Sequence, residues 1–482
     1  MKVSKTTVFK GVFWNFIERF AAQVVSLIVS IVLARLLDAD EYGTVSLVMV
    51  FITIANVFVT SGFGISLIQK KEADNIDFST VFYFSLFFSA ILYTLFFILA
   101  GPIANFYNRP ILKPVIRVLM LCIPVMGINS VQQAYVSRNM LFKKMFCSTL
   151  IGTIISAFVG ITLAYLGFGV WALVAQTLSN TVIGTIILQF VIEWRPIRTF
   201  SFKRLGSLFN YGSKLLFQSI IVQIYSSLRS LIIGKLYTPS DLAFYTKGNH
   251  FPELICNSID TAINSAIFPA MSIEQELIER IKVMARKTVQ VSSYVMNPIL
   301  IGFIVIAEPF ISVILTDKWL PAVPYLRICC IILLFRPVQT AILQAIKAIG
   351  RSDIVMKIDI PIRIFALCIL FISIRLGVIY IALSEILITI FGTVLYAITA
   401  KKNIGYKYSE MSKDLLNNTI IAVVMGIIVW AVGEYLIINK IIVLLVQIIS
   451  GVIIYLLLSM LTKNESYKYI LSILCEVLKK KR

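Results

Sequence analysis

The sequence predicts an all-α polytopic membrane protein with about 14 transmembrane helices. Apolar residues make up 59% of its 482 positions and charged residues only 14%, more apolar side chains than a water-soluble core could absorb. They gather in stretches of about 20 residues, the length with which a helix crosses hydrocarbon. No stretch alternates as a barrel strand does, and backbone amides in a bilayer have to be paired internally, so the stretches are expected to be helices.

The predicted spans follow one another closely along the whole chain. In order they cover residues 10–37, 43–68, 80–106, 113–137, 146–166, 170–193, 208–237, 243–270, 288–308, 324–347, 354–374, 377–400, 417–437 and 440–462. Those at 113–137, 243–270 and 354–374 are the weakest assignments. The connections are short, so no soluble domain is expected between the spans. The inner segment Ser272–Lys287 is predicted to be an amphipathic helix on the membrane surface.

Positive charge is distributed unevenly between the two sides of the predicted membrane. The net charge of +20 would suggest a nucleic-acid partner for a soluble protein, but here the basic residues flank apolar spans. If the N-terminus is cytoplasmic, the outer loops hold only Arg109, Lys113, Lys318, Arg375 and Lys440. Most remaining basic residues then lie inside, up to the terminal run 479–482. This bias predicts an even number of spans, cytoplasmic termini and no nucleic-acid partner.

A ten-residue pattern occurs twice, 200 positions apart, at the outer end of an apolar stretch. The first copy is Ala34–Gly43 and the second is Gly234–Ala243, and Gln23 and Gln223 fall on the same offset. Each copy runs from a small and a basic residue through a polar turn to an acid. Membrane transporters built from two related halves hold their cargo where the halves meet.

The repeat predicts two pseudo-symmetric six-helix bundles, residues 1–193 and 208–400, joined by a basic cytoplasmic connecting loop at 194–207. The two spans within 417–462 carry almost no charge and are predicted to be peripheral additions. Residues 463–482 form a basic cytoplasmic tail.

Ionisable residues at membrane depth are functional candidates, because burying them is costly. The candidates for a cationic, substrate-binding cavity are Arg19, Lys214, Arg229, Arg336 and Arg363. The possible ion-coupling residues are Glu18, Asp260, Asp359 and Glu385.

The spacing along the sequence indicates which of these candidates could form an ion pair within their own helix. Glu18 and Arg19 are adjacent on a helix and point about 100° apart, so they cannot pair with each other. Arg336 has no acid in its own span and precedes a proline. Asp359 and Arg363 are four residues apart and could form an ion pair that only holds the helix.

No residue pattern indicates catalysis, a metal or a cofactor. The seven cysteines are scattered, without metal-ligand or disulfide spacing. His250 is the single histidine and is expected to be a hydrogen-bonded helix residue rather than a proton-coupling group. No nucleotide-binding loop is present, so energy would come from an ion gradient or from consumption of the cargo.

Cationic side chains at membrane depth favour an anionic cargo. Arginine suits phosphate because its planar fork donates two parallel hydrogen bonds and stays charged when dehydrated. Organic cations would be repelled, and a neutral sugar would not require the charge. A phosphate or diphosphate headgroup on a lipid fits best.

Several short motifs resemble those of bacterial polysaccharide flippases, the O-antigen and exopolysaccharide (Wzx-type) branch of the multidrug/oligosaccharidyl-lipid/polysaccharide flippase superfamily. The motifs lie at Leu33–Leu37, Glu41–Gly43, Ser61–Phe63, Leu67–Lys71, Phe268–Ser272, Asp317–Ala322 and Gly350–Asp353. The resemblance extends over the first twelve predicted helices.

The resemblance implies a V-shaped pair of six-helix bundles that moves undecaprenyl-diphosphate-linked oligosaccharide from the cytoplasmic to the outer leaflet by alternating access. Arg19 would match the family's low arginine on the first helix, and Arg229 its cationic position on the seventh. Arg336 and Arg363 are carried over less closely, and Glu18 has no counterpart in the family pattern. The implied partners are the lipid-linked glycan, membrane lipids, and a polysaccharide polymerase with its chain-length machinery.

Two other classes of protein remain open. A multidrug/cation antiporter of the same fold would need an acidic cavity, for which Asp260, Asp359 and Glu385 are the available residues. A glycan polymerase or glycosyltransferase could use the outer pair Asp38 and Asp40, but the loop is only a few residues long and reads better as a turn. An enzyme is therefore not expected.

Overall fold

The computed structural model describes residues 23–60, 64, 66–67, 70, 73–436 and 439–480, and their regular elements are all helical. Contacts divide the chain into two compact units, Met1–Ala243 and Phe244–Arg482. This division leaves the seventh predicted span in the first unit, whereas the sequence repeat assigns it to the second bundle. The boundaries drawn from the repeat stay a prediction.

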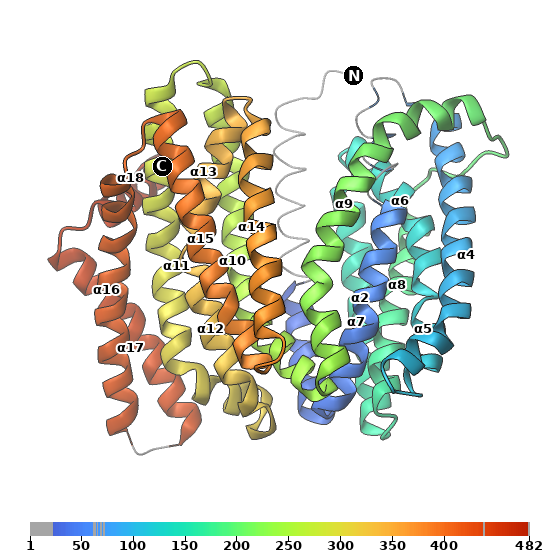
Figure 1. The fold of residues 1–482 in the computed structure, drawn as a ribbon, viewed down its shortest axis with the longest axis horizontal. Coiled ribbons are helices and arrows are strands. Elements are labelled where there is room, and N and C mark those ends of the chain that lie inside the picture. The colour runs from blue at the N-terminus through green and yellow to red at the C-terminus, as the bar shows by residue number, and fades with distance from the viewer. Residues whose placement is uncertain are drawn as a thin grey trace. The chain divides into compact units, whose positions relative to one another are not determined.

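The first unit is a bundle of long helices (Figure 1). Its elements are a helix at Gln23–Leu36, α2 (Ala39–Thr60), α4 (Asn75–Phe106), α5 (Leu112–Leu119), α6 (Cys122–Arg138), α7 (Phe142–Tyr165), α8 (Val170–Val191) and α9 (Phe202–Leu236).

The second unit receives α10 (Pro239–Ile273), whose first residues still belong to the first unit. It continues through α11 (Ile278–Leu315), the 3-10 helix η1 (Asp317–Ala322), α12 (Val323–Leu333), α13 (Arg336–Ala348), α14 (Ser352–Ser373), α15 (Val378–Ile404), α16 (Tyr408–Tyr435), α17 (Lys440–Leu461) and α18 (Glu465–Lys480).

The helices confirm an all-α, multi-pass membrane protein. Within the described ranges, ten helices are long and apolar enough to cross a membrane, or eleven if the pair Asp317–Leu333 and Arg336–Ala348, bent by 41°, is one span. The count of 14 is not confirmed. The helices α10 and α14 fall short because polar and charged residues interrupt them, and much of the first predicted span lies outside the described residues.

The two copies of the sequence repeat form the same local structure. In the first, the backbone N–H of Asp38 donates to Glu41 Oε2 at 2.8 Å, where α2 begins. In the second, the backbone N–H of Thr238 donates to Asp241 Oδ2 at 3.1 Å, where α10 begins. An acid three residues along thus caps both helices, which explains why the pattern recurs.

Glycine allows close helix contacts around the second copy of the repeat, inside the first unit. A Cβ atom on Gly43 of α2 would lie 1.8 Å from the carbonyl oxygen of Pro239. One on Gly234 of α9 would lie 2.7 Å from a methyl carbon of Leu47. Small residues at helix contacts are typical of membrane bundles, where packing rather than hydrophobicity drives association.

Glycines also allow α7 and α8 to pack closely. Gly152 faces Gly184, and a Cβ on Gly152 would lie 3.0 Å from the Cα of Gly184. Ser148 Oγ donates to the carbonyl oxygen of Gly184 at 2.6 Å. These contacts hold the two helices together as one closely packed wall.

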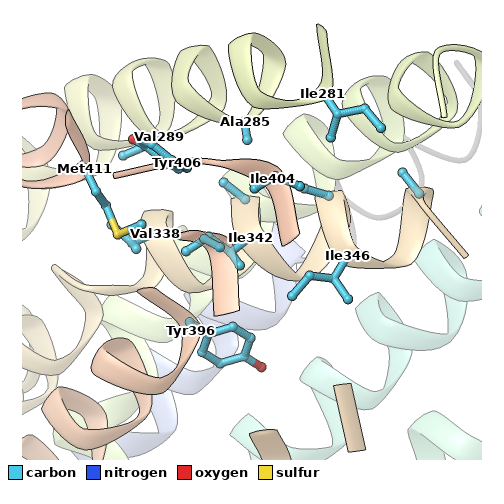
Figure 2. Close-up of a cluster of buried hydrophobic side chains, with 14 of the residues drawn as sticks. Ile281, Ala285, Val289, Val338, Ile342, Ile346, Tyr396, Ile404, Tyr406 and Met411 are labelled. Carbon is cyan, nitrogen blue, oxygen red and sulfur yellow. The ribbon is translucent and has the colours of Figure 1, made fainter. Parts of the chain in front are cut away.

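A hydrophobic cluster in the second unit joins α11, α13 and α15 (Figure 2). Ile281 of α11 and Ile342 of α13 are fully buried in it. The prediction of a surface helix at Ser272–Lys287 is therefore wrong, since residues 278–287 are the first turns of the 38-residue helix α11. An amphipathic pattern requires an apolar partner but does not specify whether that partner is lipid or protein.

Ion pairs gather at the ends of the helices that the charge bias places inside. In the first unit, Arg204 lies 2.5 Å from Asp74 and 3.3 Å from Asp77, and Lys70 lies 2.6 Å from Asp77. The side-chain hydrogen bond from Arg204 lowers the pKa of Asp74 to about 2. Asp74 also caps α4 by accepting from the backbone N–H of Asp77 at 3.0 Å.

The second unit has a corresponding cluster. Arg286 Nε lies 2.8 Å from Asp414, and the hydroxyl of Tyr406 donates to the same carboxylate at 2.8 Å. Burial raises the pKa of Tyr406, which keeps this hydroxyl a donor. The cluster ties α11 to the start of α16.

Candidate functional site

Polar and charged side chains line one helix of the second unit, α10. Lys247 is only 8% exposed and Asp260 only 7%. The ammonium nitrogen of Lys247 lies 5.9 Å from the ring centroid of Trp319. Ionisable groups buried at this depth are costly, and such groups mark functional sites in membrane proteins more often than structural ones.

Arg336 contacts two of the α10 side chains. Its Nε forms a close ion pair with Asp260, and its Nη2 donates to Asn257 Oδ1 at 2.6 Å. Arg336 begins α13, just after the break that follows α12, and the side chain keeps 31% of its surface exposed. The sequence singled out Arg336 and Asp260 but could not show that they pair, because they lie 76 residues apart on different helices.

A polar cavity of about 300 Å³ lies beside Arg336, within the second unit. Arg336, Gln339, Thr340, Thr389 and Tyr396 are among its lining residues. Gln339 Nε2 donates to Thr393 Oγ1 at 2.9 Å, which links α13 to α15. A cationic group and several hydrogen-bonding groups therefore share one cavity.

The other ionisable candidates in the second unit have partners as well. Tyr245 donates its hydroxyl proton to Glu385 Oε1 at 2.7 Å. Arg363 and Asp359 form the ion pair that their spacing predicts, at 3.9 Å.

In the first unit, the structure reaches only part of the predicted set. Arg229 lies partly buried on α9. Lys214 belongs to α9, but its side chain is not among those described. Glu18 and Arg19 lie outside the described residues.

The first unit also contains a polar pocket of about 290 Å³ between α2, α6, α7 and α8. Its lining includes the amide side chains Asn56, Asn129, Gln133 and Asn180. These amides carry no charge, so the criterion of ionisable residues at membrane depth does not identify them. The available indication was the presence of four amide side chains in apolar spans, although their convergence needs the tertiary structure.

A third hollow, an apolar groove of about 340 Å³, lies in the second unit between α11, α16 and α17. Pro298, Phe303 and Leu456 are among its lining residues. Such a surface suits hydrocarbon rather than a polar group.

The outer aspartates Asp38 and Asp40 take part in local contacts. Asp40 lies 3.0 Å from Arg109, and the backbone of Asp38 takes part in the cap of α2. Across the part of the chain that the structure describes, no group of three or more His, Cys, Asp and Glu side chains could hold a metal. The contacts of Asp38 and Asp40 fit the turn that the sequence favours for this loop.

Comparisons with known sequences agree with one another. A family model described as "Polysaccharide biosynthesis protein" matches residues 32–324. The lipopolysaccharide biosynthesis protein WzxC of Escherichia coli (strain K12) is 24% identical in an alignment 410 residues long that covers 83% of this chain and 82% of the relative. The teichuronic acid biosynthesis protein TuaB of Bacillus subtilis (strain 168) is 22% identical in an alignment 442 residues long that covers 88% of this chain and 89% of the relative.

Solved structures share the fold. A lipid II flippase MurJ in an inward closed conformation superposes with a TM-score of 0.76 at 14% identity, covering 93% of this chain and 98% of that one. An inward-facing multidrug resistance MATE family transporter of the MOP superfamily superposes with a TM-score of 0.61 at 14% identity, covering 81% and 96%. At these identities the likeness extends to the fold alone.

Proposed function

Because the chain belongs to the family of polysaccharide biosynthesis proteins, we propose that it is a flippase for lipid-linked glycans. It moves polyprenyl-diphosphate-linked oligosaccharide from the cytoplasmic to the outer leaflet of the bacterial plasma membrane by alternating access. Both termini lie in the cytoplasm. The observation that carries the proposal is Arg336, a partly exposed guanidinium at a polar cavity among membrane-spanning helices.

The chemistry of Arg336 fits a diphosphate. A guanidinium can donate two parallel hydrogen bonds to phosphate oxygens and keeps its charge when water is removed. In this structure the guanidinium of Arg336 is paired with the carboxylate of Asp260. A diphosphate would compete with that carboxylate for the same N–H donors. Such competition lets the site release its cargo, because the ion pair re-forms when the phosphate leaves.

The remaining ionisable residues are assigned by the same reasoning. Arg19, Lys214, Arg229 and Arg363 would supply further positive charge along the path of the diphosphate. Glu18, Asp260, Asp359 and Glu385 are the candidates for coupling to an ion gradient.

The chemistry required is transport rather than catalysis. The two named relatives are biosynthesis proteins for lipopolysaccharide and teichuronic acid, so the cargo would be a repeat unit of a surface polysaccharide. Such a unit is expected to pass to a polysaccharide polymerase and its chain-length machinery on the outer face.

Leaflet-resolved labelling of undecaprenyl-linked glycan in intact cells tests the proposal. Deleting the gene should make the labelled glycan accumulate in the inner leaflet and abolish the surface polymer, and restoring the gene should reverse both effects. An unchanged leaflet distribution after deletion would overturn the proposal. Increased sensitivity to cationic drugs, with normal glycan export, would instead support the antiporter.

A further inference from the structure

The polar pocket of the first unit differs from the Arg336 cavity in its chemistry. Its lining contains four carboxamide side chains, those of Asn56, Asn129, Gln133 and Asn180. It also contains five hydroxyl side chains, those of Thr60, Ser130, Ser148, Thr149 and Thr181. Among the described residues that line it, none is charged. A diphosphate would find no countercharge there, so the pocket suits an uncharged ligand rich in hydrogen-bonding groups.

Two of the amide groups have unused hydrogen-bonding capacity. Asn56 Oδ1 and Asn129 Oδ1 are buried and accept no hydrogen bond from the residues that the structure describes. Leaving a buried acceptor unpaired destabilises a protein, and native proteins rarely tolerate it without a functional reason. Both oxygens are therefore available to a donor from a ligand.

The hydroxyl groups are arranged to accept as well. Thr60, Ser130 and Thr149 each donate their proton to a carbonyl oxygen of their own helix, at 2.8, 2.9 and 3.0 Å. Their oxygen lone pairs can still accept from a ligand hydroxyl. The pocket thus offers acceptors from hydroxyls and both donors and acceptors from amides, which matches the alternating donor and acceptor character of a sugar ring.

Size and position are consistent with one sugar residue loaded from the inner side. The volume of about 290 Å³ is near the lower limit of about 300–1,000 Å³ for ligand pockets. Asn129 lies nine residues before Arg138, about 14 Å along α6, and Ser148 lies six residues after the start of α7, about 9 Å. Arg138 donates to the carbonyl oxygen of Leu67 at 2.8 Å and marks the charged end of the unit.

We propose that the pocket formed by Asn56, Asn129, Gln133 and Asn180 binds an uncharged sugar residue of the lipid-linked glycan. The inference rests on the proposed function and adds to it a division of labour, in which arginines hold the diphosphate and the pocket recognises the glycan. The close contact of α7 with α8 through Gly152 and Gly184 supplies one wall of the site. Apolar Met126, Met145 and Leu188 would cover the C–H faces of the sugar.

Binding by the purified full-length protein tests this assignment with two probes. The first probe is the lipid-linked glycan that accumulates in cells without the gene, and the second is bare undecaprenyl diphosphate. Wild type should bind the glycan-bearing lipid more tightly. The double variant Asn56→Leu/Asn129→Leu should lose about 30-fold in affinity for that lipid, the value of two neutral hydrogen bonds, and keep its affinity for the bare lipid.

Gln132→Leu is the matched control. Gln132 lies on α6 with Asn129, and its buried amide oxygen also accepts no hydrogen bond from the described residues, but it is not among the residues that line the pocket. This variant should bind both lipids like wild type. Equal losses for Gln132→Leu and the double variant would overturn the proposal, because a general packing effect would then explain both.

The stability of the double variant is a second readout. Replacing unpaired buried amides by leucine should leave the melting temperature unchanged or higher, while binding of the glycan falls. If the double variant misfolds, Thr149→Val with Thr181→Val preserves shape and removes two hydroxyls, and the same selective loss is expected. Unchanged preference for the glycan-bearing lipid in a folded variant overturns the pocket but not the flippase, whereas failure of wild type to bind either lipid overturns both.

Discussion

At the scale of single residues, substitutions of Arg336 and Asp260 show whether Arg336 binds cargo or only neutralises Asp260. Arg336→Ala should reduce glycan export strongly, because the diphosphate loses its cation and Asp260 is left as an uncompensated charge in a nearly buried position. Asp260→Asn should lower export less than Arg336→Ala, because Arg336 remains cationic while the carboxylate that competes with the diphosphate is lost. Export is measured as leaflet-resolved labelling, with protein abundance in the membrane as the control.

The double variant Arg336→Ala/Asp260→Asn distinguishes the two roles. A cation required by the diphosphate is still missing in this variant, so export should stay low even though no buried charge remains unpaired. Recovery of export to the wild-type level would show that Arg336 serves only to neutralise Asp260.

Asp74 allows a residue-scale prediction about pH. Its pKa is lowered to about 2 in the folded protein, whereas an unfolded aspartate titrates near 3.9. Stability from the charged form is therefore fully present above about pH 4 and is lost as the pH falls toward 2. The difference in melting temperature between wild type and Asp74→Asn should be constant from about pH 5 to 8 and shrink below about pH 4.

Asp74→Ala provides the comparison, since it also removes the acceptor that caps α4. Losing an N-cap costs about 1 kcal/mol, so this variant should be less stable than Asp74→Asn throughout the same pH range. If the two variants melt at the same temperature, the cap does not contribute to stability.

At the scale of elements, the close approach of α2 to the start of α10 depends on Gly43. Gly43→Ala would place a methyl group against the carbonyl of Pro239, which neither backbone can accommodate without moving. The expected cost is about 1–3 kcal/mol, typical of overpacking, and is measured as a lower melting temperature of the full-length protein in detergent. Gly101→Ala in α4 is the control, because a Cβ there meets no atom within 4 Å.

The two copies of the sequence repeat share their helix caps. Asp38 with Glu41 and Thr238 with Asp241 cap two helices in the same way, although the side chains differ. If Gly43→Ala melted like wild type, the contact between α2 and Pro239 would be loose, and only the caps would explain the repeat.

At the scale of the whole molecule, apolar stretch length and charge bias were sufficient to predict a helical membrane protein. Stretch length and flanking charge can both be read from one segment of the sequence without knowing what it packs against. Partners could not be predicted in this way, because Asp260 and Arg336 meet only when α10 packs beside α13. For the same reason, the apolar face at Ile281 was assigned to lipid although it packs against α13 and α15.

The polar pocket shows the same limit. A single asparagine in an apolar span is a weak indication, and nothing in the local sequence shows that Asn56, Asn129 and Asn180 converge on one hollow. The ionisable residues could be identified from the sequence because placing even one charged side chain in a bilayer costs a large free energy. The neutral amides are distinctive only as a group.

Transfer of glycan between the leaflets of proteoliposomes tests the central claim most directly. The purified full-length protein is reconstituted with labelled undecaprenyl-diphosphate glycan, and arrival of the label in the opposite leaflet is followed over time. Wild type should transfer the label much faster than protein-free liposomes, and Arg336→Ala should approach the protein-free rate. Equal rates with and without wild-type protein, under an imposed proton or sodium gradient as well as without one, would contradict a flippase.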